Sequence, residues 1–379
     1  MKRLSSLLML ILPGVAVFAD DAKPELKPYG FLKGDMYIAT DGVSSWGQPQ
    51  PTAVSRATGD TVNDQTMAFS AAHSRFGLKG NTDVGKINVG GVLELDFFSA
   101  NSNTNFNANP RMRLAYAFCK PVQGLDIRIG QQWDLFSPLN PTTNNTNANL
   151  WYNGNYGFRR PQFQARYALN LEPVVPGIQL SIGEGAKEGS DIGRDNLSLT
   201  PMIQGRLYAD IMEKITVGAG GAYTTHGKND EIETYGISAD LSLTLHKLFA
   251  LKGEYGWGQN LNDVNIFNIA GNKFVTNDDD SIVNTTDKVI SGFWFNATSQ
   301  PLDFLTIVAG FAMESNLSDT IWEGTARENL TFYGDLIFPI GKYFSLTAEY
   351  QYVMTTVGFL DGDKEYAANV IDIAGKISF

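Results

Sequence analysis

The sequence predicts an all-β fold: a transmembrane antiparallel up-and-down β-barrel of 16 strands. Short runs of alternating apolar and polar residues fill the chain from Leu26 onward, short and long connections alternate, and the last run, VIDIAGKISF, ends on an aromatic residue. Strand side chains alternate with period two, so one face of such a run suits lipid and the other suits water. In the last run these faces hold Ile371, Ile373, Gly375, Ile377 and Phe379, and Asp372, Ala374, Lys376 and Ser378.

The first 19 residues have the pattern of a cleaved signal peptide. Lys2 and Arg3 precede the apolar segment 7–18, and Val17-Phe18-Ala19 suits signal peptidase. The apolar segment is shorter than the ~20 residues of a spanning helix. We therefore expect a signal peptide at 1–19 and a single barrel domain at 20–379.

Composition narrows the possible partners. Mean hydropathy is −0.15, which suits a barrel because half of every strand is polar. The net charge of −11 argues against nucleic acid as a partner. The single cysteine excludes a disulfide within the chain.

Period-two alternation bounded by turn residues places the strands. They are predicted at 29–40, 66–79, 86–99, 110–120, 125–136, 158–169, 177–184, 199–210, 214–225, 232–245, 249–258, 288–298, 304–315, 328–338, 343–354 and 367–379. Seven short connections alternate with eight mostly longer ones. An even number of strands with both ends on the periplasmic side requires this arrangement, with short periplasmic turns opposite longer external loops.

One face of the predicted strands is consistently apolar. In the fourth strand Met112, Leu114, Tyr116 and Phe118 are assigned to it. No Asp, Glu, Lys or Arg occupies the interior of this face in any run. A basic residue there would cost about 2–4 kcal/mol at the bilayer midplane. The alternative is a soluble β-sandwich, which would bury the same face between two sheets and tolerate charges near strand ends.

The opposite face carries nearly all the strand charge. Its basic members in the first half are Arg75, Arg111, Arg113, Arg128, Arg160, Arg166 and Arg206, and its acidic members in the second half are Glu254, Glu314, Asp335, Glu349 and Asp372. In a closed barrel these would form two walls of one channel, with a transverse field that aligns polar and charged solutes. The alternative is that the arginines merely pair with neighbours such as Glu94 and Asp96.

The segment 133–158 between the fifth and sixth strands is long, rich in Asn and uncharged apart from Asp134. Such a loop can fold into the lumen and narrow it. Composition favours an ordinary external loop about equally.

No motif for catalysis or cofactor binding is present. His73, His226 and His246 form neither a metal-binding spacing nor a catalytic triad pattern. The acidic run 277–280 lacks the spaced ligands and the glycine of a calcium loop, which favours a solvated loop. We therefore expect no enzyme, no metal and no cofactor.

Several motifs resemble a known family. SRFGLKG (74–80), RMRLAYAFCKP (111–121), RIGQQWDLFSP (128–138) and the terminal Phe379 resemble trimeric sixteen-stranded outer-membrane porins. YGFLKGDMYIATDG (29–42) and GQQWDLFSPLNP (130–141) are most similar to DcaP-like porins. The porin resemblance covers the chain after residue 19, whereas the DcaP-like resemblance rests on these short motifs.

The resemblance implies a homotrimer in the bacterial outer membrane, with the third external loop inside each barrel and arginines at its constriction. It implies uptake of small anions, in particular dicarboxylates, and contacts with outer-membrane lipid and lipopolysaccharide. The strand ending in Phe379 would bind the barrel-assembly machinery. The implied constriction residues are Arg111, Arg113, Arg128, Arg160 and Arg166, then Arg75, and then the loop amides of Asn144, Asn145 and Asn147.

Two functional hypotheses follow. The first is a passive diffusion channel for small hydrophilic solutes that prefers anions. The second is a plugged barrel that serves as an adhesin, a receptor or a structural surface protein. Conductance in a planar bilayer distinguishes them.

Overall fold

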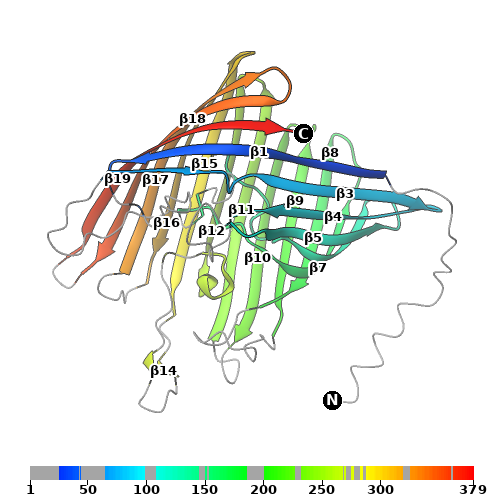
Figure 1. Cartoon of the computed structure of the whole chain (residues 1–379). Coiled ribbons are helices and arrows are strands. Elements are labelled where there is room, and N and C mark those ends of the chain that lie inside the picture. Colours follow the sequence, from blue (N-terminus) through cyan, green and yellow to red (C-terminus); the bar gives the residue numbers. More distant parts are fainter. Residues whose placement is uncertain are drawn as a thin grey trace.

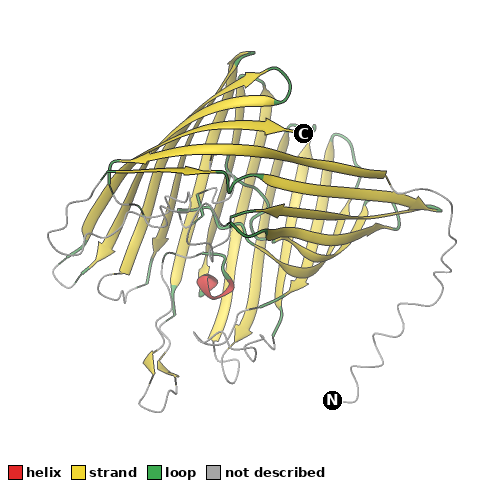
Figure 2. Ribbon diagram, in the orientation of Figure 1, coloured by secondary structure: helices red, strands yellow, loops and turns green. Residues whose placement is uncertain are grey.

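The computed structural model is a β-barrel (Figures 1 and 2). It describes residues 25–41, 43, 65–98, 108–144, 150–151, 153–185, 200–226, 232–267, 269, 275–276, 282–284, 287–318, 325–359 and 362–379. The predicted signal peptide at 1–19 and the acidic run at 277–280 lie outside these residues.

Nearly all of the described chain forms strands. Their bounds are β1 Glu25–Ala39, β2 Thr66–Ser70, β3 Arg75–Val84, β4 Ile87–Asp96, β5 Arg111–Lys120, β6 Leu125–Trp133, β7 Arg159–Ala168, β8 Val174–Gly183, β9 Met202–Ile211, β10 Ile215–His226, β11 Ile232–His246, β12 Phe249–Gln259, β13 Val275–Thr276, β14 Ile282–Asn284, β15 Val289–Leu302, β16 Leu305–Asn316, β17 Thr325–Ile340, β18 Phe344–Gly358 and β19 Lys364–Ser378. A short 3-10 helix, η2, spans Leu261–Val264, and the β13–β14 hairpin is separate from the main sheet.

The main sheet closes on itself. Each strand pairs antiparallel with its neighbours along the chain, and β1 pairs with β19 on one side and with β2 and β3 on the other. The sheet has 17 strands, but β2 and β3 share one position along β1, so 16 positions surround the barrel. The predicted sixteen-stranded barrel is confirmed.

The predicted strand 66–79 is interrupted at residues 71–74. Ser70 lies opposite Asp35 and Arg75 lies opposite Phe31, so the interrupted strand carries one residue more than β1 does across the same span. The extra residue reverses the alternation of side chains. As a result the odd-numbered Met67 and Phe69 and the even-numbered Phe76 and Leu78 all face outward, with exposed fractions of 41–64%.

The break directs His73 into the barrel, where its side chain is fully buried. Its Nδ1 atom lies 3.0 Å from Asp35 Oδ2 and 3.1 Å from the Tyr37 hydroxyl. Its ring stacks on Phe98 at 5.8 Å between centroids, and Lys33 pairs with Asp35. This histidine therefore belongs to a structural network at the strand break.

The apolar face lies outside and the polar face lies inside, which excludes the soluble sandwich. In β19, Ile371 and Ile373 are 42% and 44% exposed, whereas Asp372 between them is 2% exposed. A soluble sandwich would show the reverse burial. An outer band of exposed Leu, Ile and Phe side chains around a closed sheet is the arrangement that hydrocarbon requires.

The facing predicted for β5 is wrong beyond Met112. The register between β4 and β5 shifts between Glu94 and Leu95, which leaves Arg113 as a bulge residue. A bulge adds one residue and reverses the alternation after it. Leu114 therefore lies opposite the inward Glu94, and Leu114, Tyr116 and Phe118 point to the lumen rather than to lipid.

Short turns and long loops alternate as predicted. The seven short connections are 85–86, 121–124, 169–173, 212–214, 247–248, 303–304 and 341–343. Glycines at φ +63°, +83° and +65°, which are Gly85, Gly124 and Gly341, occupy three of these turns. Such dihedrals suit glycine because it has no Cβ. In its described part, the chain contains no helix long and apolar enough to cross a membrane.

The outward position of Leu207 gives a test of the membrane-facing surface. Leu207 in β9 is 64% exposed. We expect Leu207→Arg to lower the free energy of unfolding from lipid by about 2–4 kcal/mol, because the charge would enter hydrocarbon. The matched control Leu245→Arg, near the short turn after β11, should cost about 0–1 kcal/mol. Urea unfolding from liposomes measures both, and equal losses would contradict the predicted depth.

Candidate pore lining and constriction

The third external loop is inside the barrel, as predicted. It leaves β6 at Asp134, and the backbone N–H groups of Leu135 and Phe136 both donate to Gln204 Oε1 of β9 at 3.0 Å. Farther along, Thr142 N–H donates to Asn296 Oδ1 of β15 at 3.0 Å. The loop therefore crosses the lumen and docks on the wall opposite β5–β7.

Glu254 of β12 anchors this loop to the wall. Its carboxylate accepts hydrogen bonds from Ser137 Oγ at 2.6 Å, Leu139 N–H at 2.7 Å and Trp294 Nε1 at 3.1 Å. A carboxylate held by several donors is a strong anchor because charge-assisted hydrogen bonds are shorter and stronger than neutral ones. Burial raises the pKa of the nearby loop phenol Tyr156 well above its usual value.

A second anchor lies at Asn144. Its N–H donates to Glu349 Oε2 at 2.6 Å, and its side-chain amide donates to Asp372 Oδ2 at 2.7 Å. Asn144 is thus 6% exposed and holds the loop rather than presenting an amide to open water. Asn145 and Asn147, the other two predicted loop amides, lie outside the described residues.

A second inward segment was not predicted. This segment, residues 260–267 and 269, follows β12, includes η2 and packs its apolar side chains against the third loop inside the barrel. The shared core comprises Phe136, Tyr156, Met202, Ala222, Leu261, Val264, Ile266, Phe267, Ile269 and Ile290. Run-by-run alternation gave no signal for this packing, because its apolar residues lie in a connection between strands.

Polar contacts fix this inward segment at three points. Ile269 N–H donates to Glu314 Oε1 at 2.7 Å, and Arg160 Nη2 donates to Val264 O at 2.7 Å. Asp263 Oδ2 lies 3.0 Å from His226 Nε2. Burial raises the pKa of the Asp263 carboxyl, and the neighbouring His226 partly offsets that rise.

The predicted acidic residues therefore lie behind the two inward segments. Glu254, Glu314 and Glu349 accept hydrogen bonds from them, and Asp335 lies opposite Glu349 on the neighbouring strand. All four are at most 4% exposed. This wall serves as a docking surface for the two inward segments, and the open cavities lie on the basic side.

The upper basic cluster, formed by Arg75, Arg111 and Arg113, lies where β3, β4 and β5 meet, at the strand ends away from the short turns. Arg113 donates to Glu94 at 2.6 Å and to Asp96 at 2.9 Å, and Arg111 forms two bonds with Asp96 at 2.8 and 2.9 Å. Arg75 lies farther from Glu94, at 3.8 Å. The ion pairs with Glu94 and Asp96 expected in the alternative interpretation are present, with three arginines sharing two carboxylates.

Arg159 joins this cluster and was not predicted. Its guanidinium lies 4.8 Å from the centroid of the Trp133 ring, and that of Arg113 lies 5.9 Å from the same ring. Alternation along β7 places Arg160 on the inner face and therefore its neighbour Arg159 on the outer face. At the start of a strand, next to a loop that turns inward, a side chain does not have to follow this alternation, and Arg159 does not.

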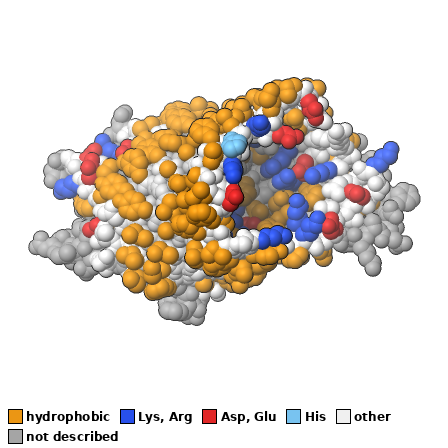
Figure 3. Space-filling view, turned by 90° about the horizontal axis from the view of Figure 1, so that it is seen from above, with side chains coloured by type: hydrophobic (Ala, Val, Ile, Leu, Met, Phe, Trp, Pro, Cys, Tyr) orange, Lys and Arg blue, Asp and Glu red, His pale blue; other side chains and the backbone are white. Residues whose placement is uncertain are grey.

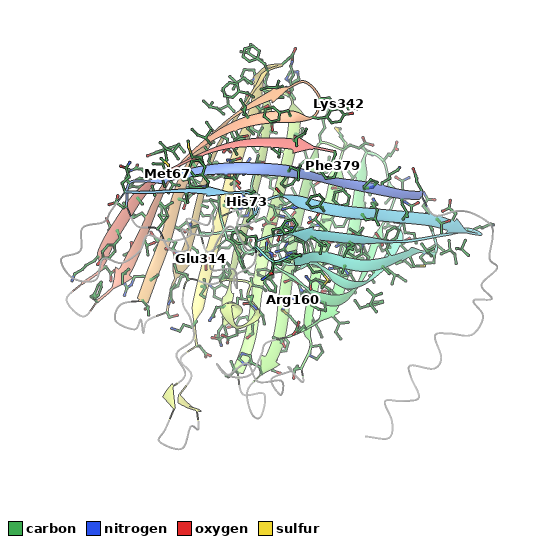
Figure 4. All side chains as sticks on the ribbon, in the orientation of Figure 1. Met67, His73, Arg160, Glu314, Lys342 and Phe379 are labelled. Atoms are coloured by element: carbon green, nitrogen blue, oxygen red, sulfur yellow. The ribbon has the colours of Figure 1, made fainter. Side chains whose placement is uncertain are left out.

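Two other predicted arginines are buried in one-to-one ion pairs. Arg160, labelled in Figure 4, donates to Asp134 Oδ2 at 2.7 Å. Arg206 donates to Asp240 Oδ1 at 2.6 Å. Each pair contributes almost no net charge to its surroundings, so their field falls off quickly with distance.

The open space lies between the third loop and strands β5–β10. A cavity of about 400 Å³ is lined by Leu114, Tyr116, Arg128, Gln132, Trp133, Asp134, Leu135, Pro138, Leu139, Arg166, Gln179, Arg206, Tyr208, Asp210 and Thr216. A second cavity of about 470 Å³, near the short turns, shares Arg128, Arg166, Gln179 and Tyr208 with it. The view from above shows a hollow whose walls carry many Lys and Arg side chains (Figure 3).

Positive charge exceeds negative charge along these two cavities. Their charged lining residues are Lys86, Lys120, Arg128, Arg166 and Arg206, against Asp126, Asp134 and Asp210. Arg128 pairs with Asp126 at 2.7 Å, whereas Arg166 donates to the neutral Gln164 and forms no ion pair with a described carboxylate. Arg166 thus lines both cavities without a described carboxylate at ion-pair distance.

The described residues contain no group of three or more His, Cys, Asp and Glu side chains arranged to hold a metal ion.

Comparison with solved structures shows the same architecture in known channels. The outer membrane channel DcaP of Acinetobacter baumannii matches with a TM-score of 0.74 and 18% identity, over 94% of this chain and 97% of that chain. The anion-selective porin from Comamonas acidovorans matches with a TM-score of 0.58 and 13% identity, over 94% and 100%. OmpF of Salmonella typhi, in a complex with daunomycin, matches with a TM-score of 0.58 and 14% identity, over 93% and 97%.

Comparisons with models of protein families and with curated proteins find no match. The structural matches nevertheless extend over nearly the whole of each chain, and they agree with the closed sheet. The chain therefore has the fold of the sixteen-stranded outer-membrane porins.

Proposed function

We propose that the chain is an outer-membrane porin, a passive diffusion channel for small hydrophilic solutes that prefers anions, dicarboxylates among them. The observation that carries the proposal is the pair of cavities beside the inward third loop, with their excess of Lys and Arg. A low-dielectric wall with an excess of one sign raises the local concentration of oppositely charged solutes. Conduction requires such binding to stay weak, which suits partly exposed cations such as Arg128.

The anion-selective porin from Comamonas acidovorans, which has the same fold, supports this preference. The trimer form of OmpT of Vibrio cholerae, another structure with this fold, supports a homotrimer. We propose that three copies assemble side by side in the outer membrane, each with its own pore. A heat-sensitive band at three times the monomer mass on a denaturing gel would support the trimer, and a monomer band alone without heating would contradict it.

A plugged barrel that serves as a receptor or adhesin is the second candidate. The apolar core that the third loop and the second inward segment build inside the lumen favours it. The two candidates differ in a single observable property, since a plugged barrel conducts no ions.

Planar bilayers test the proposal. The purified protein should insert in discrete conductance steps, and under a KCl gradient the reversal potential should have the sign of chloride preference. Absence of steps after verified insertion would support the plugged barrel. Steps with a reversal potential of cation sign would contradict the anion preference.

A further inference from the structure

The bulge in β5 gives the lumen an apolar surface that a simple strand would not provide. Without the extra residue at Arg113, Leu114 and Tyr116 would face lipid, as unbroken alternation requires. With it, both line the 400 Å³ cavity. An apolar side chain that faces a water-filled pore gains nothing from burial, so its placement there suggests contact with a solute.

The third loop contributes a second part of this surface. Pro138 and Leu139 line the same cavity. Their position is fixed, because Leu139 N–H donates to Glu254 Oε1 at 2.7 Å and Ser137 Oγ donates to Glu254 Oε2 at 2.6 Å. The apolar groups therefore come from two elements that are held independently, a strand of the wall and an anchored loop.

Positive charge borders the same cavity. Arg166 has only the neutral Gln164 as its described hydrogen-bond partner, and Arg128 is shared between Asp126 and the face of Tyr116, 5.4 Å from the ring centroid. Arg206, in contrast, is neutralised by Asp240. The lining also holds two carboxylates, Asp134, which pairs with Arg160, and Asp210, which accepts a hydrogen bond from Thr216. The charge available to a solute is thus that of Arg166, with the paired Arg128 beside it, and apolar or aromatic side chains make up about half of the remaining lining.

We propose that this cavity is a binding site for carboxylates that carry an aromatic ring. The carboxylate would lie at Arg166 and Arg128, and the ring would lie against Leu114, Tyr116 and Leu139. The cavity volume lies within the range of small-molecule pockets, which combine mostly apolar walls with a few placed polar groups. The inference rests on the proposed function and adds a substrate class to the same pore.

Competition in planar bilayers tests this inference with benzoate, cyclohexanecarboxylate and acetate, which carry the same charge. The native channel should be blocked by benzoate at concentrations roughly fivefold below those of acetate, since ring contacts are the only added interaction. The blocking concentration of cyclohexanecarboxylate should lie between those of benzoate and acetate. Equal blocking by benzoate and acetate would overturn the inference.

Variants on the two elements locate the site. In Leu114→Asn/Tyr116→Ser we expect benzoate and acetate to block the channel at similar concentrations. In Leu139→Asn, on the loop, we expect the difference between the two blocking concentrations to become smaller. The matched control Ala115→Ser/Ala117→Ser changes the opposite face of the same strand and should keep the native difference. If the strand variant fails to insert, Leu139→Asn decides alone, and a native benzoate preference in it would contradict the site.

The two proposals fail in different ways. A cation-selective native channel would contradict the proposed function whatever benzoate does. An anion-selective channel that does not distinguish benzoate from acetate would leave the proposed function standing and overturn only the aromatic site.

Discussion

Replacing Arg128 and Arg166 together with Gln is expected to abolish the anion preference of the channel. Both residues line both cavities, and Arg166 has no carboxylate partner among the described residues. A unit charge ~7 Å from a permeating ion in water contributes about 0.6 kcal/mol, which changes the local ion concentration about threefold. Each charge attracts anions and repels cations by the same energy, so removing both should lower the ratio of anion to cation permeability on the order of 50-fold.

Reversal potentials under a KCl gradient measure this ratio. The matched control is Arg206→Gln/Asp240→Asn, which removes a buried ion pair of the same barrel wall without changing the net charge. The control should keep the native ratio. An unchanged ratio in Arg128→Gln/Arg166→Gln would show that selectivity arises elsewhere, for example at the upper cluster of Arg75, Arg111 and Arg113.

Removing the carboxylate of Glu254 is expected to release the third loop from the wall. Glu254→Ala deletes the acceptor of Ser137 Oγ and Leu139 N–H and leaves the buried N–H without its partner. Hydrogen bonds to charged groups contribute about 1.5–3 kcal/mol each, and a change of ~1.4 kcal/mol shifts an equilibrium tenfold. The loop should leave its docked position for a measurable fraction of the time.

Single-channel recordings should then show a larger mean conductance and added current noise in Glu254→Ala. Glu254→Gln keeps a side-chain oxygen acceptor, so its mean conductance and current noise should lie between those of the native channel and those of Glu254→Ala. Asn144→Ala removes the side-chain contact to Asp372 but keeps the backbone N–H bond to Glu349, and it should give a similar, smaller effect. Native conductance and noise in both Ala variants would mean that the loop does not need these anchors.

The sequence predicts the barrel itself because a membrane imposes a strict rule on every strand. A charged side chain on the lipid-facing side is strongly destabilising, so apolar and polar residues alternate with few exceptions along the strands. The number of strands and the positions of the turns follow from that alternation. The misassigned residues lie where one extra residue enters a strand. The bulge at Arg113 reverses the facing of Leu114, Tyr116 and Phe118, and the break at 71–74 interrupts a strand predicted as continuous; neither leaves a local signal such as Gly or Pro.

The site was less predictable because it depends on contacts between distant parts of the chain. Glu254 and Glu349 were correctly assigned to the inner face, but their partners lie 115 and 205 residues away in the third loop. Alternation specifies the face of a residue and not what lies in front of it. The role of these carboxylates as loop anchors, and the contribution of Arg159, follow only from the folded loop.

The most direct test of the account is the chemical accessibility of position 166 in the open channel. In a Cys119→Ser background, Arg166→Cys should react with a water-soluble methanethiosulfonate reagent, and a bulky anionic adduct should lower the conductance. A cationic adduct of equal size should retain more of the anion current than the anionic one. Complete modification with unchanged current, or no modification in a conducting channel, would contradict an ion pathway between the third loop and the basic wall.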